Sequence, residues 1–420
     1  MTLALEGIRI LDITDAVSGP FGAMMLGSFG AEVIRIESQR HLGFRDNSNN
    51  VKMTPDATQH AKATPNPAKP DLTSLTTPGF ARYNLDKLSI TLNLTKPEGR
   101  EIFKKLVKIS DVVIDNLSFG IMHQWGFDYT SLSQIKSDII VAGLPSFGKG
   151  PHEKWTTWGM NLLCFTGFAY TWGHPETPME ERAASSTYGD YIAGMMAVSS
   201  IITALYHREQ TGEGQYLEVS QTEAAASLLG VQDLDYFVNG RVPQPVGNRN
   251  PQFAPYNCYP CKGEDRWCVI TVLNEADWQH LCTALESPKW ASEPKFASME
   301  SRLKNVVELD KNIEGWTRQK TPHQVMRILQ SFGVAAGAVQ NSEDLFFDLQ
   351  LRNRGHMVEL EAGPRGKLTF DQPPIRLSAG QKPSAERAPY LGEHNDYVYH
   401  QLLGLTPEQV DKLTMDKVIY

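Results

Sequence analysis

The sequence predicts an α/β protein in which a large domain is built on a mostly parallel β-sheet and a smaller α+β domain follows it. Three observations support this prediction. Strand-like and helix-like segments alternate between residues 8 and 143, the pattern of a parallel sheet with helices on both faces. The 420 residues exceed the size at which one hydrophobic core keeps growing. After Ser220 the chain becomes loop-rich, which favours a domain boundary there.

We therefore expect three parts. Residues 1–204 would form the N-terminal part of a large Rossmann-like domain. Residues 225–325 would form the small domain, and residues 326–420 would return to the large domain.

The first βαβ unit is predicted at residues 8–37. Ile8–Thr14 is a strand, a helix starts at Ser18-Gly19-Pro20, and Glu32–Glu37 is the second strand. Proline suits the first turn of a helix. A dinucleotide-binding site would need the spacing G-x-G-x-x-G in this turn. The turn reads S-G-P-F-G, and its proline removes one of the amides that would contact phosphate, so the sequence disfavours NAD.

The alternation is interrupted between Arg40 and Phe80. This stretch contains five prolines and has no hydrophobic periodicity. Loops of such length are usually functional lids or disordered segments, and the sequence leaves its role open.

Alternation then resumes, and polar or turn residues follow several of the predicted strands. The predicted elements are strands at 83–92, 112–116 and 139–143 and helices at 97–109 and 131–136. Ligands collect at the carboxyl ends of parallel strands. Val17, Asn116 and Ser146 lie at such ends.

A run without charged side chains follows Asp190. Small and apolar residues fill Tyr191–Tyr206, which predicts a helix buried on most sides. A turn and an alternating strand at Gln215–Ser220 follow it. A carboxylate at the start of such a helix is either an N-cap or a desolvated nucleophile or general base. The pattern alone does not choose between the two.

The segment around Asp190 resembles the signature of the class III CoA-transferases, the family of formyl-CoA, carnitine and bile-acid CoA-transferases. In that family the catalytic aspartate is followed four residues later by glycine, then by a small-residue helix and a T-G-x-G-Q turn. The matching residues are Asp190, Gly194, Thr211, Gly212, Gly214 and Gln215. Further matches are N-x-x-K-x-S-I-x-L at 84–92, L-G-E-H at 391–394, and a G-V-P-x-G-P-V pattern at 333–339 with both prolines replaced by alanine. The resemblance runs in collinear order over about residues 4–405.

The resemblance implies that Asp190 is the catalytic nucleophile. It would attack an acyl-CoA thioester to give a mixed anhydride, and the released thiolate would convert this anhydride into an aspartyl-CoA thioester. CoA thioesters would be substrate and product, with no permanently bound cofactor and no metal. Gly189 precedes Asp190. It either lets a backbone amide reach a developing oxyanion or is an ordinary turn glycine.

The resemblance also implies a CoA-binding groove. Its positions carry Ala16, Val17, Ser18, Leu92, Asn93, Thr95, Asn116, Leu117, Ser118, Trp125, Trp158 and Gly159. Ser38 and Gln124 stand where the family commonly has arginine, and Arg35, Arg40 or Lys96 are the candidates to replace it at the phosphates.

Other departures concern the acid substrate. Val17 replaces the glutamine of formyl-CoA transferase, and Gly247–Pro251 stands in the region of that enzyme's glycine-rich loop. We read these departures as evidence against oxalate or formate. A larger, less polar acid of the benzylsuccinate type, with succinyl-CoA as an example donor, would fit Val17, Trp158 and the aromatic residues at 165, 168, 170 and 172, unless these are only core packing.

Family members form interlaced dimers, so the resemblance implies a homodimer or a heteromer with a related subunit. Two other functions stay open. One is a 2-methylacyl-CoA racemase or epimerase of the same fold, for which His152 would be a candidate base. The other is a non-catalytic partner subunit, which would not need Asp190.

Composition disfavours several classes. A net charge of −8 without any Lys/Arg run argues against nucleic-acid binding. The N-terminus lacks the pattern of a signal peptide, and the run after Asp190 is too short and too rich in Gly and Ser for a membrane span, so we expect a cytoplasmic protein. Five cysteines suit a reducing compartment, and no second pair completes a zinc site with Cys258 and Cys261.

Overall fold

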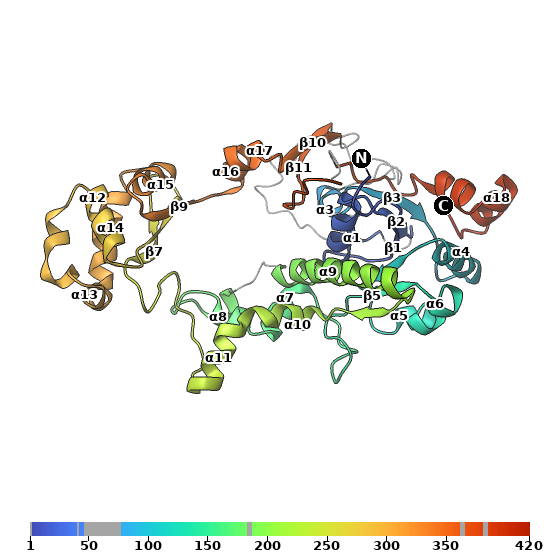
Figure 1. Ribbon diagram of the computed structural model, residues 1–420, viewed down its shortest axis with the longest axis horizontal. Coiled ribbons are helices and arrows are strands. Elements are labelled where there is room, and N and C mark those ends of the chain that lie inside the picture. The colour runs from blue at the N-terminus through green and yellow to red at the C-terminus, as the bar shows by residue number, and fades with distance from the viewer. Residues whose placement is uncertain (1, 40–41, 46–76, 183–186, 362–365, 381–384) are drawn as a thin grey trace. The chain divides into compact units, whose positions relative to one another are not determined.

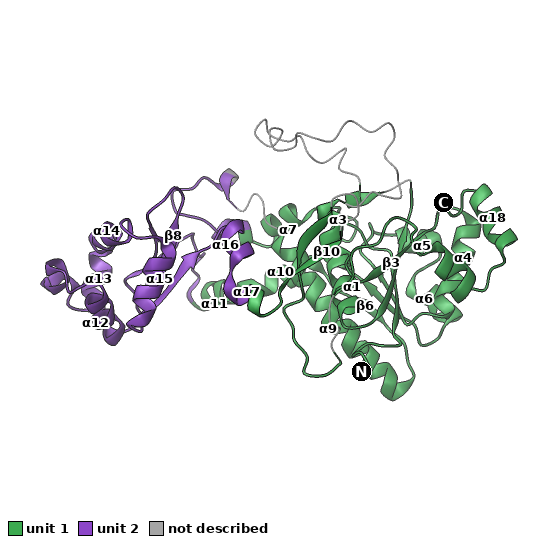
Figure 2. Cartoon of the chain, turned by 90° about the horizontal axis from the view of Figure 1, so that it is seen from above, with its two compact units in different colours: residues 1–168, 183–238, 352–420 green, residues 169–182, 239–351 purple. Residues whose placement is uncertain are grey.

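The computed structural model describes residues 2–39, 42–45, 77–182, 187–361, 366–380 and 385–420. Most of the predicted 40–80 excursion lies outside these residues, and its described ends form the short helices η1 (Gly43–Arg45) and α3 (Pro78–Tyr83). The chain divides into two compact units (Figure 2). The first comprises residues 1–168, 183–238 and 352–420, and the second comprises residues 169–182 and 239–351.

The small domain was expected at 225–325, whereas the second unit consists of a long segment, 239–351, and a separate short segment, 169–182. Strand β9 (Ala335–Val339) pairs with β8 (Trp267–Thr271), so these hydrogen bonds keep the chain in the second unit beyond residue 325. At the other boundary, all but the last residue of α11 (Gly230–Asn239) belongs to the first unit.

The first unit is built on a six-stranded parallel sheet, which confirms the predicted fold class. The strand order is β3-β2-β1-β4-β5-β6, and every neighbouring pair is parallel. The strands are β1 (Arg9–Asp12), β2 (Glu32–Glu37), β3 (Lys87–Thr91), β4 (Val112–Asp115), β5 (Ile140–Gly143) and β6 (Tyr216–Glu218). The order reverses direction between β1 and β4, which is the place where open α/β sheets bind ligands.

Helices cover both faces of this sheet (Figure 1). Residues such as Ile10, Val112 and Ile140 pack on one face with α1 (Ser18–Ser28) and α9 (Tyr188–Thr211). Alternate residues pack on the other face with α4 (Pro97–Lys108), α6 (Tyr129–Ile135), the π-helical turn Tyr397–Leu402 and α18 (Pro407–Met415). Burial on two faces explains why the central strands β4 and β5 are almost continuously apolar.

The remaining elements of the first unit lie mostly around the carboxyl ends of the strands and in the C-terminal segment. They are α5 (Ile121–Trp125), α7 (Gly159–Phe165), α8 (Phe168–Thr171), which reaches into the second unit, α10 (Gln221–Ala226), η4 (Ser227–Leu229) and the antiparallel hairpin β10 (Met357–Glu361) and β11 (Lys367–Asp371). No helix among the described residues is long and apolar enough to span a membrane.

The second unit contains an antiparallel sheet in the order β7-β8-β9, with β7 at Tyr256–Pro260. Its helices are α12 (Glu275–Ala284), α13 (Met299–Lys304), α14 (Val306–Thr317), α15 (Pro322–Ser331) and α16 (Ser342–Phe347), with α17 (Leu349–Asn353) at the boundary. Asp310 of α14 accepts hydrogen bonds from Tyr259 Oη at 2.7 Å, Asn257 Nδ2 at 3.0 Å and Arg249 Nη2 at 3.0 Å. These contacts anchor the Gly247–Pro251 loop within the second unit.

Helix α9 differs from the prediction of a helix buried on most sides. Its buried residues form one stripe at helical spacing: Gly189, Asp190, Ala193, Gly194, Ala197, Val198, Ile201 and Ala204. On other faces, Met196, Ile202 and Tyr206 are exposed in the single chain. The sequence therefore carries more apolar surface on this helix than one chain buries.

Helices α1 and α9 approach each other closely because both have glycine at the contact. A Cβ atom on Gly194 would lie 2.7 Å from the backbone oxygen of Ser18, and a Cβ atom on Gly22 would lie 3.1 Å from the backbone oxygen of Gly194. Since backbone atoms cannot move aside as side-chain ends can, the contact requires glycine on both helices.

We predict that Gly194→Ala lowers the free energy of unfolding by about 1–3 kcal/mol because the added methyl group separates α1 from α9. The matched control is Gly230→Ala, since Gly230 has a helical backbone and its Cβ would meet no atom within 4 Å. The control should be unchanged or more stable by up to about 1 kcal/mol. Chemical denaturation of the three proteins provides the test, and equal stabilities for both variants would contradict the role given to the glycine contact.

Candidate active site

Asp190 is the third residue of α9 and is not its N-cap. The N-cap is Thr187, and its side chain makes no capping hydrogen bond to a described residue. Asp190 is 8% exposed, and its Oδ2 atom is buried without a hydrogen-bond partner among the described residues. A buried carboxylate oxygen without a partner is costly, so the structure favours the functional interpretation of Asp190 over the capping one.

Burial raises the pKa of the Asp190 carboxyl to about 6, and a hydrogen bond from its own backbone amide opposes the rise only in part. The group is thus mainly ionised at neutral pH but poorly solvated. Such a carboxylate is more reactive than an exposed one, and groups with this type of shift concentrate at functional sites.

Two glycines create the space around this carboxylate. A Cβ atom on Gly159, the first residue of α7, would lie 2.1 Å from Asp190 Oδ2. A Cβ atom on Gly189 would lie 2.9 Å from Leu162 Cδ2. Gly189 is helical rather than part of a turn, and its place in the structure is explained by close packing of α9 on α7.

The loop after β1 is fixed by the residue that follows β4. The Asn116 side chain donates from Nδ2 to the Asp15 oxygen at 2.7 Å and to Ser18 Oγ at 3.2 Å, and its Oδ1 accepts from the Asp15 amide at 2.8 Å. Ala16 has a left-handed backbone with φ of +60°. The buried residue Val17 then precedes α1. The predicted residues Ala16, Val17 and Ser18 therefore lie at the switch point of the sheet, in a segment that the predicted residue Asn116 fixes from the end of β4.

Five predicted CoA contacts line a single pocket of about 200 Å³. They are Leu92, Asn93, Thr95, Leu117 and Trp125, and the remaining walls come from the ends of β1 and β2. Ser118 lies in a neighbouring pocket of about 490 Å³ over β4, β5 and β6. Trp158 lies outside both linings, 70% exposed, directly before Gly159. The structure thus distributes the predicted positions over the loop, the pocket and the start of α7.

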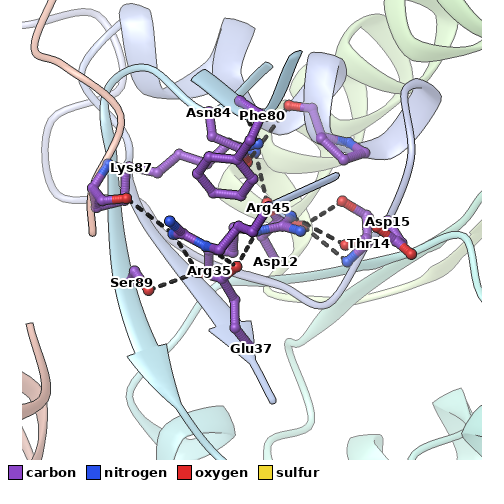
Figure 3. Close-up of polar contacts among 12 residues, drawn as sticks. Asp12, Thr14, Asp15, Arg35, Glu37, Arg45, Phe80, Asn84, Lys87 and Ser89 are labelled. Atoms are coloured by element: carbon purple, nitrogen blue, oxygen red, sulfur yellow. Dashed lines mark hydrogen bonds and ion pairs between the residues drawn. The ribbon is translucent and has the colours of Figure 1, made fainter. Parts of the chain in front are cut away.

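A buried ionic network borders this pocket, and two of its members, Arg35 and Glu37, line the pocket (Figure 3). Asp12 accepts from Lys87 Nζ at 2.7 Å, and the same oxygen lies 3.4 Å from Arg35 Nη1. Glu37 accepts from Arg45 at 2.7 Å and 2.8 Å and from Ser89 Oγ at 2.7 Å. Burial alone would raise the pKa of Asp12, but Lys87 and Arg35 outweigh it and lower this pKa to about 2.

Sequence reasoning missed this network. The available signals were charged residues inside otherwise apolar strands, such as Arg35 and Glu37 in E-V-I-R-I-E. Arg35 is buried, lies 3.4 Å from both Asp12 and Glu37, and also lines the pocket, so it stays a candidate phosphate ligand whose position these acids fix. Arg40 lies outside the described residues, and Lys96 Nζ donates to the backbone oxygen of Asp416.

An aromatic cluster precedes α7 and includes its last residue. The ring centroids of His152 and Trp155 are 3.8 Å apart, and Phe147 and Phe165 make edge contacts with the His152 ring at 5.9 Å and 5.7 Å. Phe168 contacts Tyr188 with centroids 6.5 Å apart, whereas Tyr170 and Trp172 belong to the second unit.

Residues 5–395 match the family model for CoA-transferase family III. A formyl-CoA:oxalate CoA-transferase from Rhodopseudomonas palustris strain BisA53 is 30% identical, over 98% of this chain and 96% of its own length. The same enzyme from Bradyrhizobium sp. strain ORS 278 is 31% identical with the same coverage. The crystal structure of a CAIB/BAIF family protein from Brucella suis has a TM-score of 0.82 and 26% identity, over 96% of this chain and 100% of that chain. Rv3272 from Mycobacterium tuberculosis, with 23% identity and a TM-score of 0.74 over 94% of this chain and 99% of its own, shares the fold.

We predict that Asp190→Asn stabilises the folded chain above pH 6. The raised pKa means that the folded state holds the Asp190 proton more tightly than the unfolded state between about pH 4 and 6, so wild-type stability falls as the pH rises through this window. The side-chain amide of the asparagine variant does not ionise, so the variant does not lose stability in this way as the pH rises. At pH 7.5 the variant should be more stable than wild type by about 1–3 kcal/mol, and the difference should shrink towards pH 4.

Urea denaturation of both proteins across this pH range gives the difference directly, because the other titrating groups cancel. A variant that is less stable than wild type at pH 7.5, or a difference that does not change with pH, would contradict the raised pKa.

Proposed function

This chain belongs to CoA-transferase family III and is a CoA-transferase, and we propose that Asp190 carries CoA between two carboxylic acids as a covalent intermediate. The observation that carries the proposal is the Asp190 carboxylate itself. It lies at the position of the family's catalytic aspartate, its Oδ2 is buried without a partner among the described residues, and a glycine leaves it free space.

The chemistry follows from a carboxylate that is ionised and poorly solvated. An Asp190 oxygen attacks the thioester carbonyl of the donor, and the C–S bond breaks to give a mixed anhydride and CoA thiolate. The thiolate attacks the aspartyl carbonyl, which forms the aspartyl-CoA thioester and releases the donor acid.

The acceptor then completes the exchange. Its carboxylate attacks the aspartyl thioester, which forms a second anhydride and frees the thiolate again. Attack of the thiolate on the acceptor's acyl carbon gives the new acyl-CoA and regenerates the Asp190 carboxylate. One thioester replaces another, so no ATP is needed. The small and apolar residues of α9 next to Asp190 support this scheme, because they help to keep water from the anhydrides.

CoA would lie along the carboxyl ends of β1, β3 and β4. The pocket lined by Leu92, Asn93, Thr95, Leu117 and Trp125 offers apolar side chains with a few polar groups, as small-molecule sites usually do. From there the Asn116-fixed loop at Ala16–Ser18 would lead the ligand towards α9, where Gly194 lies against Ser18.

The acid substrate is proposed to be larger and less polar than oxalate, such as a benzylsuccinate-type dicarboxylate, with succinyl-CoA as the donor to try first. Support comes from Val17 in the loop after β1 and from Trp158, whose exposed indole precedes Gly159 beside the nucleophile. The relatives at 30–31% identity act on formyl-CoA and oxalate, so these two substrates belong in the same screen.

An interlaced dimer, of identical or related subunits, is part of the proposal. Apolar side chains that one chain leaves exposed support it. They include Ile202 and Tyr206 on α9, and Val231 and Phe237 on α11, of which Phe237 is 81% exposed.

The two other candidate functions have weaker support. The described ring contacts of His152 are with Phe147, Trp155 and Phe165, which suit packing rather than the base of a racemase or epimerase. A non-catalytic subunit would gain nothing from the desolvated carboxylate of Asp190.

We predict that succinyl-CoA, or another acyl-CoA of a test panel, modifies wild-type protein at Asp190. Hydroxylamine or borohydride would trap the aspartyl thioester, and peptide mass spectrometry would locate it. Asp190→Asn should give no adduct. The matched control is Asp115→Asn, because burial also raises the pKa of Asp115, to about 7, yet we give it no part in the transfer.

An adduct at another residue, or an adduct that survives in Asp190→Asn, would exclude Asp190 as the carrier. Deuterium exchange at the α-carbon of a 2-methylacyl-CoA without any adduct would instead favour the racemase.

We also predict that Gly159→Ala lowers kcat by about 100-fold, because the new methyl group displaces the carboxylate by on the order of 1 Å. Steady-state kinetics with Gly230→Ala as control would test this. Full activity of Gly159→Ala would show that the carboxylate does not need the space that this glycine leaves.

A further inference from the structure

The pocket wall that follows β3 is held from behind by two distant parts of the chain. Residues Leu92–Thr95 form this wall. Behind it lie Asn395, which follows the L-G-E-H motif, and the segment Asp416–Tyr420. Neither Asn395 nor this segment lines the pocket, so their contacts act on the wall and not on a ligand.

Asn395 makes three hydrogen bonds at the base of the wall. Its Oδ1 accepts from the Thr91 amide at 2.9 Å, and its Nδ2 donates to Thr91 Oγ1 at 3.0 Å and to the Tyr420 oxygen at 2.9 Å. The Thr91 hydroxyl in turn donates to the Tyr420 oxygen at 2.9 Å and accepts from the Tyr420 amide at 3.0 Å. A hydroxyl has one donor and two acceptor positions, so all of them are used.

The C-terminal segment supports the next residue of the wall. The Asn93 amide donates to the Val418 oxygen at 2.8 Å, and Val418 and Ile419 are buried in the core beside β3. The Asn93 side chain then fixes Thr95, because its Oδ1 accepts from the Thr95 amide at 3.1 Å and from Thr95 Oγ1 at 2.6 Å. Hydrogen bonds and the short chain segments between them therefore connect Asn395 with the rim of the pocket.

We propose that Asn395 is a positioning residue for CoA binding, which fixes the Leu92–Thr95 wall through Thr91 and the Tyr420 backbone. The inference rests on the proposed function of the pocket. It explains why the Asn395 side chain makes three hydrogen bonds next to the Leu92–Thr95 wall although Asn395 does not line the pocket. A pocket of about 200 Å³ has little tolerance for a shifted wall, so loss of this support weakens binding without altering the nucleophile.

The test is isothermal titration of the full-length protein with CoA, together with steady-state kinetics. Asn395→Ala should raise the CoA Kd and the acyl-CoA KM by about tenfold and leave kcat within about twofold, because two or three modest hydrogen bonds are lost far from the reacting atoms. Asn395→Gln keeps the acceptor and both donors but displaces them by one methylene group, so it should fall between. This milder variant also serves if the alanine variant folds poorly.

The matched control is Asn274→Ala. Asn274 is the N-cap of α12 in the second unit, where its side chain accepts from the Asp277 amide, so this change removes a comparable structural hydrogen bond away from the pocket. The control should keep the wild-type Kd, and thermal unfolding of all proteins shows whether stability alone accounts for any loss.

The outcomes distinguish the positioning role of Asn395 from the proposed function of the protein. Weaker CoA binding in both Asn395 variants, with kcat and the control unchanged, supports the positioning role. Unchanged binding in Asn395→Ala overturns the inference and leaves the proposed function intact, and so does a fall in kcat without a change in Kd. If wild-type protein binds no CoA and transfers none, the proposed function fails, and the inference fails with it.

Discussion

The close approach of α9 to α1 and α7 is the constraint on which the candidate site depends. Glycine on α1, α7 and α9 lets these helices meet at distances where a single methyl group would collide with backbone or with the carboxylate itself. The result is a carboxylate at the start of a long helix with apolar surroundings and no partner for one oxygen. The raised pKa of this carboxyl is therefore a product of packing, since burial and not a nearby charge raises it.

Opposite conditions govern two buried acids of the adjacent sheet, Asp12 and Glu37. Asp12 and Glu37 are at least as buried as Asp190, yet cations lower the pKa of both carboxyls. Within one unit the chain thus holds two kinds of buried acid. The acids paired with cations fix the ends of β1, β2 and β3, whereas Asp190 on its helix has no cation among the causes of its pKa shift. Removing a partner from the first kind costs about 3–5 kcal/mol, which explains why such groups suit a rigid pocket lining.

Much of this could be predicted from the sequence. Alternating apolar segments were enough for the parallel sheet, because strands buried on both faces have few other patterns. Asp190 was singled out because the segment around it resembles a family signature. The sequence pattern alone did not choose between an N-cap and a nucleophile or general base. The structure separates the two by giving that place to Thr187. The contacts of Arg45 with Glu37 and of Asn395 with Thr91 could not be predicted, because they join residues that no local periodicity relates. The exposed face of α9 was also missed. An apolar residue is expected to be buried, but its apolar character does not say whether the same chain buries it.

The support of β3 by Asn395 also has a consequence for how the protein is made. The amide of Thr91 and the side chain that accepts from it are 304 residues apart in the sequence. At ribosomal rates of about 5–20 residues per second, roughly 15–60 seconds separate the synthesis of this strand from that of its partner. During that interval the edge of the nascent sheet has unpaired amides and an uncovered apolar face. The support behind the pocket wall therefore forms only after the C-terminal segment has been made, so this part of the sheet is completed last.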